Sequence, residues 1–91
     1  MSVTIKIPTP FRKFTNGERK VEVEGETVAE ALDALAATHP DIRPHVFRED
    51  GTLRADARVF VGASDIRSAQ GLETAVPAGE LLSIIPPVVG A

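Results

Sequence analysis

The chain has 91 residues, 43% of them hydrophobic and 25% charged, a balance typical of one small globular domain. It contains no cysteine, which excludes a disulfide framework, a zinc knuckle and a thiol nucleophile. The net charge of −3, with phenylalanine as the only aromatic residue type, argues against nucleic-acid binding, which relies on basic surfaces and aromatic stacking.

Residues 3–7 alternate apolar and polar side chains, as a strand with one buried face does. Residues 20–24 repeat this alternation, and Asn16-Gly17 between the two segments is a strong turn signal. The pattern predicts two strands joined as a β-hairpin with a long loop. Residues 11–15 within that loop are ambiguous.

A helix is predicted to follow, because Thr27 and Glu30 have the spacing of a capping box. An apolar stripe at helical spacing continues through Leu35, and His39-Pro40 ends the helix. Residues 41–47 are expected to form a second, short helical turn. The His39 and His45 pair makes a poor metal site without cysteine, so no metal is expected.

Residues 58–62 and 81–85 are the last two predicted strands. The final one is apolar on both faces, which is typical of a central strand. The simplest packing is an α+β arrangement, a mixed β-sheet packed on one main helix with a short second helix. The first and last strands would be central neighbours. Residues 1–85 form the domain, and residues 86–91 are predicted to be an extended tail.

The tail reads Pro-Pro-Val-Val-Gly-Ala and has no charged side chain. Its two prolines favour an extended, stiff start, and six extended residues reach about 20 Å. Such a segment suits insertion of a carboxylate into another protein's active site. A frayed end is the alternative, but frayed ends are usually polar, whereas Val88 and Val89 are apolar.

Taken together, these segments resemble the MoaD/ThiS family of ubiquitin-like sulfur carriers, which have a β-grasp fold. The resemblance covers nearly the full length. It lies in residues 3–9, 27–32, 58–62, 71–74 and 79–90. The long hairpin loop and residues 41–53 are closer to the cysteine-biosynthesis carriers of the family than to its thiamin branch.

The resemblance implies that the C-terminal carboxylate, at Gly90 and Ala91, is adenylated by a partner related to ubiquitin-activating enzymes that uses ATP and magnesium. A sulfur donor then converts it into a thiocarboxylate, whose sulfur passes to an acceptor in a synthase. Cysteine or another sulfur-containing metabolite would be the product. The tail residues Pro86, Pro87, Val88 and Val89 would enter the partner. The chain itself would be a protein co-substrate without a cofactor, and not an enzyme.

One residue departs from the family pattern, because members normally end in Gly-Gly and this chain ends in Gly90-Ala91. Glycine has no Cβ and suits narrow channels. Ala91 is either tolerated, or removed by a metallopeptidase, or disabling. Two other functions also stay open. One is a small subunit of molybdopterin synthase, and the other is a β-grasp adaptor whose tail is never activated.

A partner-docking patch is predicted from Phe60, Leu82 and Ile84, on the sheet face that the helix leaves uncovered. Loops covering these residues are the alternative. The basic residues Arg12, Lys13, Arg19 and Lys20 are expected to protect the hairpin edge by charge. The longest apolar stretch, residues 81–89, is too short to span a membrane, so a cytoplasmic protein without a membrane partner is expected.

Overall fold

The computed structural model describes residues 2–54, 57–77 and 79–85 of the chain. These residues form one sheet, two α-helices and four short 3₁₀ helices. The strands are β1 (Ser2–Lys6), β2 (Lys20–Glu24), β3 (Arg58–Val61), β4 (Ser64–Asp65) and β5 (Leu81–Ile85). The helices are α1 (Val28–Thr38), α2 (Arg43–Val46), η1 (Thr9–Phe14), η2 (Pro40–Ile42), η3 (Ile66–Ser68) and η4 (Gly71–Glu73).

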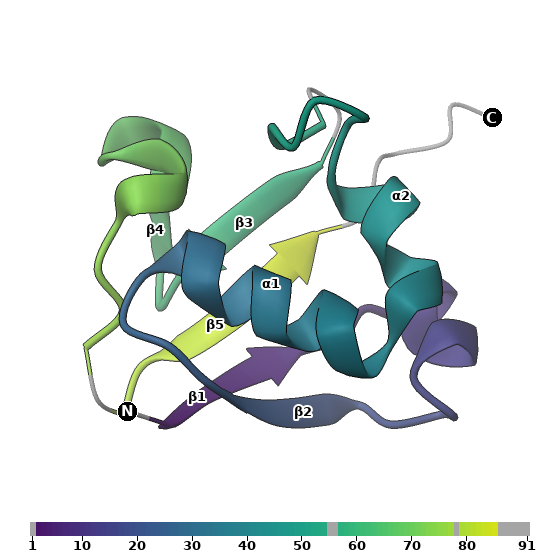
Figure 1. Ribbon diagram of the computed structural model, residues 1–91. Helices are drawn as coiled ribbons and strands as arrows, with labels where there is room; N and C mark the ends of the chain where they lie inside the picture. The colour runs from purple at the N-terminus through teal and green to yellow at the C-terminus, as the bar shows by residue number, and fades with distance from the viewer. Residues whose placement is uncertain (1, 55–56, 78, 86–91) are drawn as a thin grey trace, which may run out of the picture.

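The first and last strands lie side by side in the middle of the sheet, whose order is β2-β1-β5-β3-β4 (Figure 1). β1 and β5 run parallel, with Ile5 opposite Leu82, whereas β2 and β3 pair antiparallel with them. The expected mixed sheet with central terminal strands is therefore confirmed. Because β1 and β5 run in the same direction, both strands end at the same edge of the sheet.

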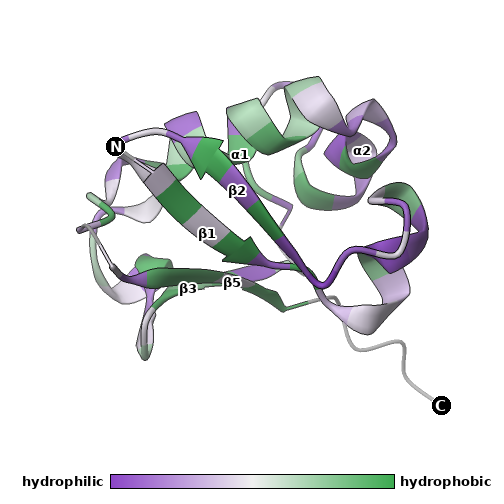
Figure 2. Cartoon of the chain, turned by 90° about the horizontal axis from the view of Figure 1, so that it is seen from below, coloured by the Kyte–Doolittle hydropathy of each residue, from purple (hydrophilic) through white to green (hydrophobic). Residues whose placement is uncertain are grey.

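Only one face of the sheet is covered, since α1 and α2 lie on the same side of it (Figure 2). Alternate strand residues point toward the helices and pack against the apolar stripe of α1. This core includes Val3, Ile5, Val21, Val23, Val59, Leu82 and Ile84 from the strands, and Val28, Ala31, Leu32 and Leu35 from α1. The other side of the sheet is called the open face below.

Two hydrogen bonds between side chains and backbone N–H groups cap the N-terminus of α1. The backbone N–H of Glu30 donates to Thr27 Oγ1 at 3.2 Å, as expected for an N-cap threonine. The Glu30 carboxylate accepts from the backbone N–H of Glu26 at 2.8 Å, one residue earlier than the capping box predicts. The predicted helix and its capping residues are confirmed, with this shift of one partner.

The hairpin loop is held together by its own hydrogen bonds. Thr15 is fully buried, and its hydroxyl lies 3.2 Å from the carbonyl oxygen of Arg12 and 3.0 Å from that of Glu18. Asn16 and Gly17 have positive φ angles of 56° and 82°, which confirms the predicted turn. Of the ambiguous residues before it, 11–14 belong to the 3₁₀ helix η1, whose Phe11 is buried, and Thr15 is its C-cap.

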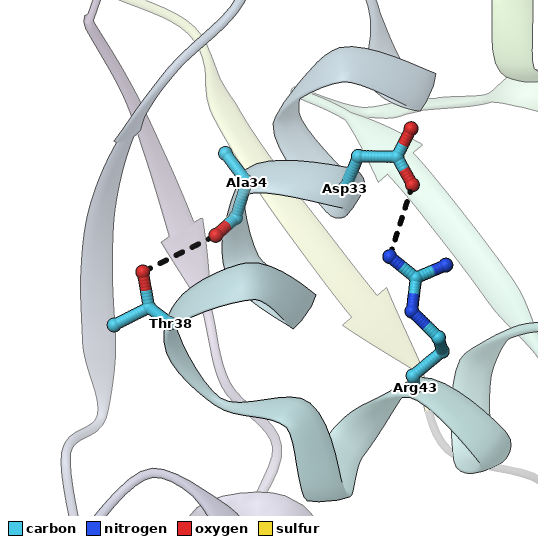
Figure 3. Close-up of polar contacts among 4 residues, drawn as sticks. All are labelled: Asp33, Ala34, Thr38 and Arg43. Carbon is cyan, nitrogen blue, oxygen red and sulfur yellow. Dashed lines mark hydrogen bonds and ion pairs between the residues drawn. The ribbon is translucent and has the colours of Figure 1, made fainter.

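The short second helix is also confirmed, as η2 followed by α2. Arg43 Nη2 lies 3.3 Å from Asp33 Oδ1 and so links α2 to α1 (Figure 3). Both side chains are about half exposed or more, so this ion pair contributes at most about 1 kcal/mol. In the same view, Thr38 Oγ1 donates to the carbonyl oxygen of Ala34 at 3.2 Å.

The polar stretch after β3 contains more structure than its sequence indicates. Gly62, with a φ of 61°, turns the chain into the two-residue strand β4, which pairs antiparallel with β3. Asp65 then caps η3 by accepting from the backbone N–H of Arg67 at 2.9 Å. None of the helices in the described part of the chain is long and apolar enough to cross a membrane.

Candidate functional site

The end of β5 at Ile85 is the place from which the predicted tail continues. The neighbouring strand β1 ends beside it, since Lys6 pairs with Ser83 in the parallel ladder. The tail residues Pro86, Pro87, Val88, Val89, Gly90 and Ala91 lie outside the described residues. The site is therefore built from the strand ends and the sheet surface that lead up to the tail.

The open face around this edge is partly apolar. Phe60 lies opposite Ser83 in the β3–β5 ladder, and Arg58 lies opposite Ile85. Ile85 is 40% exposed, more than any other large hydrophobic residue in the described ranges. Phe60 and Leu81 are half-buried on the same face. An apolar surface thus extends from Leu81 to Ile85, beside the start of the tail.

The predicted docking patch is wrong at two of its three residues. Leu82 and Ile84 are 0% and 2% exposed, and both belong to the hydrophobic core. They face α1 together with Val59, which lies opposite Ile84. A partner cannot contact side chains buried between sheet and helix. Only Phe60 of the predicted three is on the open face.

The error arises from the pairing register of β5. Successive strand residues point to opposite faces, so a shift of one residue exchanges the buried and the open set. The sequence Leu81-Leu82-Ser83-Ile84-Ile85 is apolar in both sets and does not reveal which one is buried. The ladder decides it, because Ile5 opposite Leu82 and Val59 opposite Ile84 are core residues.

The two histidines have separate structural roles. His39 is the C-cap residue of α1, and its backbone N–H donates to the carbonyl oxygen of Leu35 at 2.8 Å. The His45 ring stacks on Phe14, with ring centroids 4.5 Å apart. Among residues 2–54, 57–77 and 79–85, no three His, Cys, Asp or Glu side chains gather where a metal ion could be held.

The basic residues predicted to protect the hairpin edge lie on two different elements. Arg12 Nε donates to the carbonyl oxygen of Ile7 at 3.3 Å, and Lys13 Nζ lies 5.2 Å from the centre of the Phe14 ring. These two residues belong to η1, whereas Lys20 begins the edge strand β2. The charge on this edge is consistent with the expected protection against strand pairing.

Comparison with known proteins places the chain in a family. The ThiS family model matches residues 5–90, which is nearly the whole chain and includes Gly90. The chain belongs to the ThiS family. This finding confirms the resemblance seen in the sequence.

The similarity extends to solved structures of related carriers. The chain superposes on one in the Amycolatopsis orientalis BexX/CysO complex with a TM-score of 0.90 and 38% identity, covering 98% of this chain and 99% of that chain. It is 32% identical over 92 residues to the sulfur carrier protein CysO of Mycobacterium tuberculosis, covering 99% of both. Small archaeal modifier protein 1 of Haloferax volcanii is 39% identical over 72 residues, 78% of each chain.

These matches confirm the ubiquitin-like β-grasp fold. They also show that this ThiS-family member is a sulfur carrier protein of the CysO, ThiS and MoaD type. Sequence reasoning found the family and the fold but missed Leu81 and Ile85 on the open face. No signal in β5 alone distinguishes these two residues from Leu82 and Ile84, because all four are large aliphatic residues.

Proposed function

We propose that the C-terminal carboxylate of this chain is adenylated by an enzyme related to ubiquitin-activating enzymes and is then converted to a thiocarboxylate. One observation carries the proposal. β5 ends at the sheet edge next to β1, six residues remain beyond it, and the ThiS match continues through Gly90. A compact domain whose last strand is followed by an uncharged, apolar sequence suits delivery of a chain end into an enzyme channel.

Neither adenylation nor the conversion to a thiocarboxylate requires a catalytic side chain on the carrier. A carboxylate oxygen attacks the α-phosphorus of ATP, and pyrophosphate leaves, so the carboxylate becomes an acyl adenylate. Hydrosulfide then attacks the acyl carbon and displaces AMP, which leaves the thiocarboxylate. ATP and magnesium belong to the partner enzyme. This carrier supplies the carbon that is activated and the surface that holds it in place.

The thiocarboxylate sulfur is the group that the carrier finally transfers. It is a nucleophile that needs no thiol side chain, which agrees with the lack of cysteine in the chain. We propose a sulfur-accepting synthase of cysteine biosynthesis as the second partner, because the CysO relatives match over nearly full length. A synthase that makes another sulfur-containing metabolite, including molybdopterin, is the alternative acceptor.

Ala91 determines which carbon is activated. If the chain end is used directly, the thiocarboxylate forms on Ala91. If a metallopeptidase first removes Ala91, the thiocarboxylate forms on Gly90. An adaptor whose Gly-Ala end is never activated is the third case. In the first two cases the enzyme channel would be occupied by Pro86, Pro87, Val88 and Val89.

The open face is the proposed docking surface, with Phe60, Leu81 and Ile85 in place of the buried residues. Leu81 and Ile85 lie on β5, which leads to the tail, and Phe60 lies on β3 beside it, so contact there would place the chain end in the channel. Apolar residues that are partly or fully exposed and grouped in this way are common at protein–protein interfaces. The M. tuberculosis CysO and H. volcanii modifier structures share this sheet, with TM-scores of 0.86 for each.

A second candidate function is covalent protein modification. It is favoured by the 39% identity to small archaeal modifier protein 1. The same acyl adenylate would then be attacked by a lysine amine of a target protein, which forms an isopeptide bond and releases AMP. The nucleophile, sulfide or amine, distinguishes the two functions.

Intact-mass spectrometry tests the carrier function directly. The purified chain is incubated with the adenylating enzyme from its own organism, ATP, magnesium and sulfide. The expected mass gain is that of one sulfur replacing one oxygen. A chain lacking residues 90 and 91 is the control and should gain nothing. No gain in the full chain, with or without a trimming peptidase, would exclude the carrier function.

A further inference from the structure

The charges of the open face are separated along the strands. Lys6 on β1 lies directly opposite Lys20 on β2, and Lys6 also pairs with Ser83 of β5. Arg58 lies opposite Ile85, the last residue of β5. All three basic side chains are exposed, and none makes an ion pair with a described residue. The half of the open face nearest the tail is therefore basic.

The opposite half of the same face is acidic. Glu22 lies opposite Thr4, and Glu24 lies opposite Ser2, at the start of β1. Glu22 also accepts a hydrogen bond from Ser2 Oγ at 2.7 Å. Glu80 adjoins Leu81 at the same end of β5 and lines a surface hollow with Ser2 and Glu22, and Lys20 lines this hollow from its basic side, where the two halves meet. Strand geometry separates Glu24 from Lys20 by about 13 Å along β2.

This separation matters because the chain as a whole is acidic, with a net charge of −3. An acidic partner would be repelled by the average charge and attracted only by the basic half. Opposite charges across a contact steer association and fix its orientation more than they raise its affinity. A face with two oppositely charged halves therefore distinguishes the two ways in which a partner can lie on it.

We propose that Lys6, Lys20 and Arg58 bind an acidic rim around the mouth of the channel that receives the tail in the activating enzyme. Arg58 lies opposite Ile85, and Lys6 and Phe60 both lie opposite Ser83, directly beside the point where β5 ends. Asp65 lies on the far side of Phe60, where its carboxylate caps η3. Pairing with an acidic rim turns the tail toward the channel. The acidic half then lies away from the channel mouth. This inference rests on the proposed function, since it requires an enzyme that takes up the chain end.

Stopped-flow association with the adenylating enzyme tests the proposal. The variants Lys6→Glu and Arg58→Glu should each lower the association rate constant about tenfold at low ionic strength. The difference from the unaltered chain should shrink at about 0.5 M salt, where screening acts over only a few ångströms. Arg48→Glu makes the same charge change at an exposed position that belongs to none of the five strands and should associate at the unaltered rate.

Glu24→Lys tests the orientation, because it reverses a charge in the acidic half. It should leave the association rate unchanged or raise it. The proposal is overturned if Lys6→Glu and Arg58→Glu associate as fast as Arg48→Glu. It is equally overturned if Glu24→Lys slows association. Thermal unfolding of each variant checks that the domain remains folded.

Two further measurements separate this proposal from its alternatives. Sedimentation of the free chain shows whether the two charged halves instead pair with a second copy. A dimer that Lys6→Glu dissociates would overturn the assignment to an enzyme rim.

At saturating enzyme, the variants should still gain the mass of the thiocarboxylate. If the unaltered chain gains none, the proposed function fails. If all chains gain it and associate equally fast, only the charge proposal fails.

Discussion

Val59 and Ile84 lie directly opposite each other in the antiparallel ladder between β3 and β5, and both side chains are buried. Their neighbours Arg58 and Ile85 form the next pair and point to the open face. One step along the ladder therefore separates a core position from a surface position. Substitutions of the adjacent residues Ile84 and Ile85 should therefore have very different effects on the free energy of unfolding.

We expect Ile84→Ala to lower the free energy of unfolding by about 2–5 kcal/mol, because it leaves a cavity in the core. Ile85→Ala should change it by less than about 0.5 kcal/mol, since the side chain is partly exposed. Urea unfolding followed by circular dichroism measures both. Ile85→Asp should also weaken binding to the activating enzyme without unfolding the domain. Equal losses of stability at the two positions would contradict the assigned register.

Gly25 lies in the tight connection between β2 and α1. A Cβ at this position would be 2.9 Å from the backbone nitrogen of Ala31, closer than van der Waals contact allows. Gly25→Ala should therefore shift the start of α1 and lower the free energy of unfolding by about 1–3 kcal/mol. Glu26→Ala, at the next and exposed position, is the matched control and should have little effect in the same thermal unfolding experiment.

Thr15 is the one buried polar side chain among the described residues, and its hydroxyl closes the hairpin loop. Thr15→Val keeps the shape but leaves the carbonyl oxygens of Arg12 and Glu18 without this donor. A loss of about 1–2 kcal/mol in the free energy of unfolding is expected. Amide hydrogen exchange at Gly17 should also become faster. Thr15→Ser retains the hydroxyl and should restore slow exchange; similar exchange in both variants would assign the effect to packing.

Asp50 provides a pH-dependent prediction. Hydrogen bonds from the Thr52 hydroxyl at 2.6 Å and the Thr52 backbone N–H at 3.0 Å lower the pKa of the Asp50 carboxyl below its ordinary value. The lowered pKa means that the ionised carboxylate stabilises this turn above the ordinary pKa, and the contribution is lost as the pH falls through the folded-state pKa. Thr52→Val should raise the pKa of Asp50, measured by NMR titration. An unchanged pKa would show that the side-chain hydrogen bond is not its cause.

Local patterns in the chain predicted its elements well. Alternation of apolar residues located β1 and β2, and the threonine and glutamate at the start of α1 located its cap. These signals are short-range, since a strand or a capped turn depends on residues a few positions apart. β4 and the 3₁₀ helices that follow it were not predicted, because Ser64 and Asp65 become a strand only by pairing with β3.

The amino-acid sequence by itself determined the family and the β-grasp fold, and it shows that the uncharged residues 86–91 follow the last strand. It did not determine which side chains of that strand are accessible. Leu81, Leu82, Ile84 and Ile85 are equivalent in hydrophobicity, and only pairing with β1 and β3 decides which of them meet α1. The same pairing brings Lys6 and Arg58, far apart in the chain, to the edge where β5 ends. A strand has two faces, and the long-range register of its neighbours decides which one a partner meets.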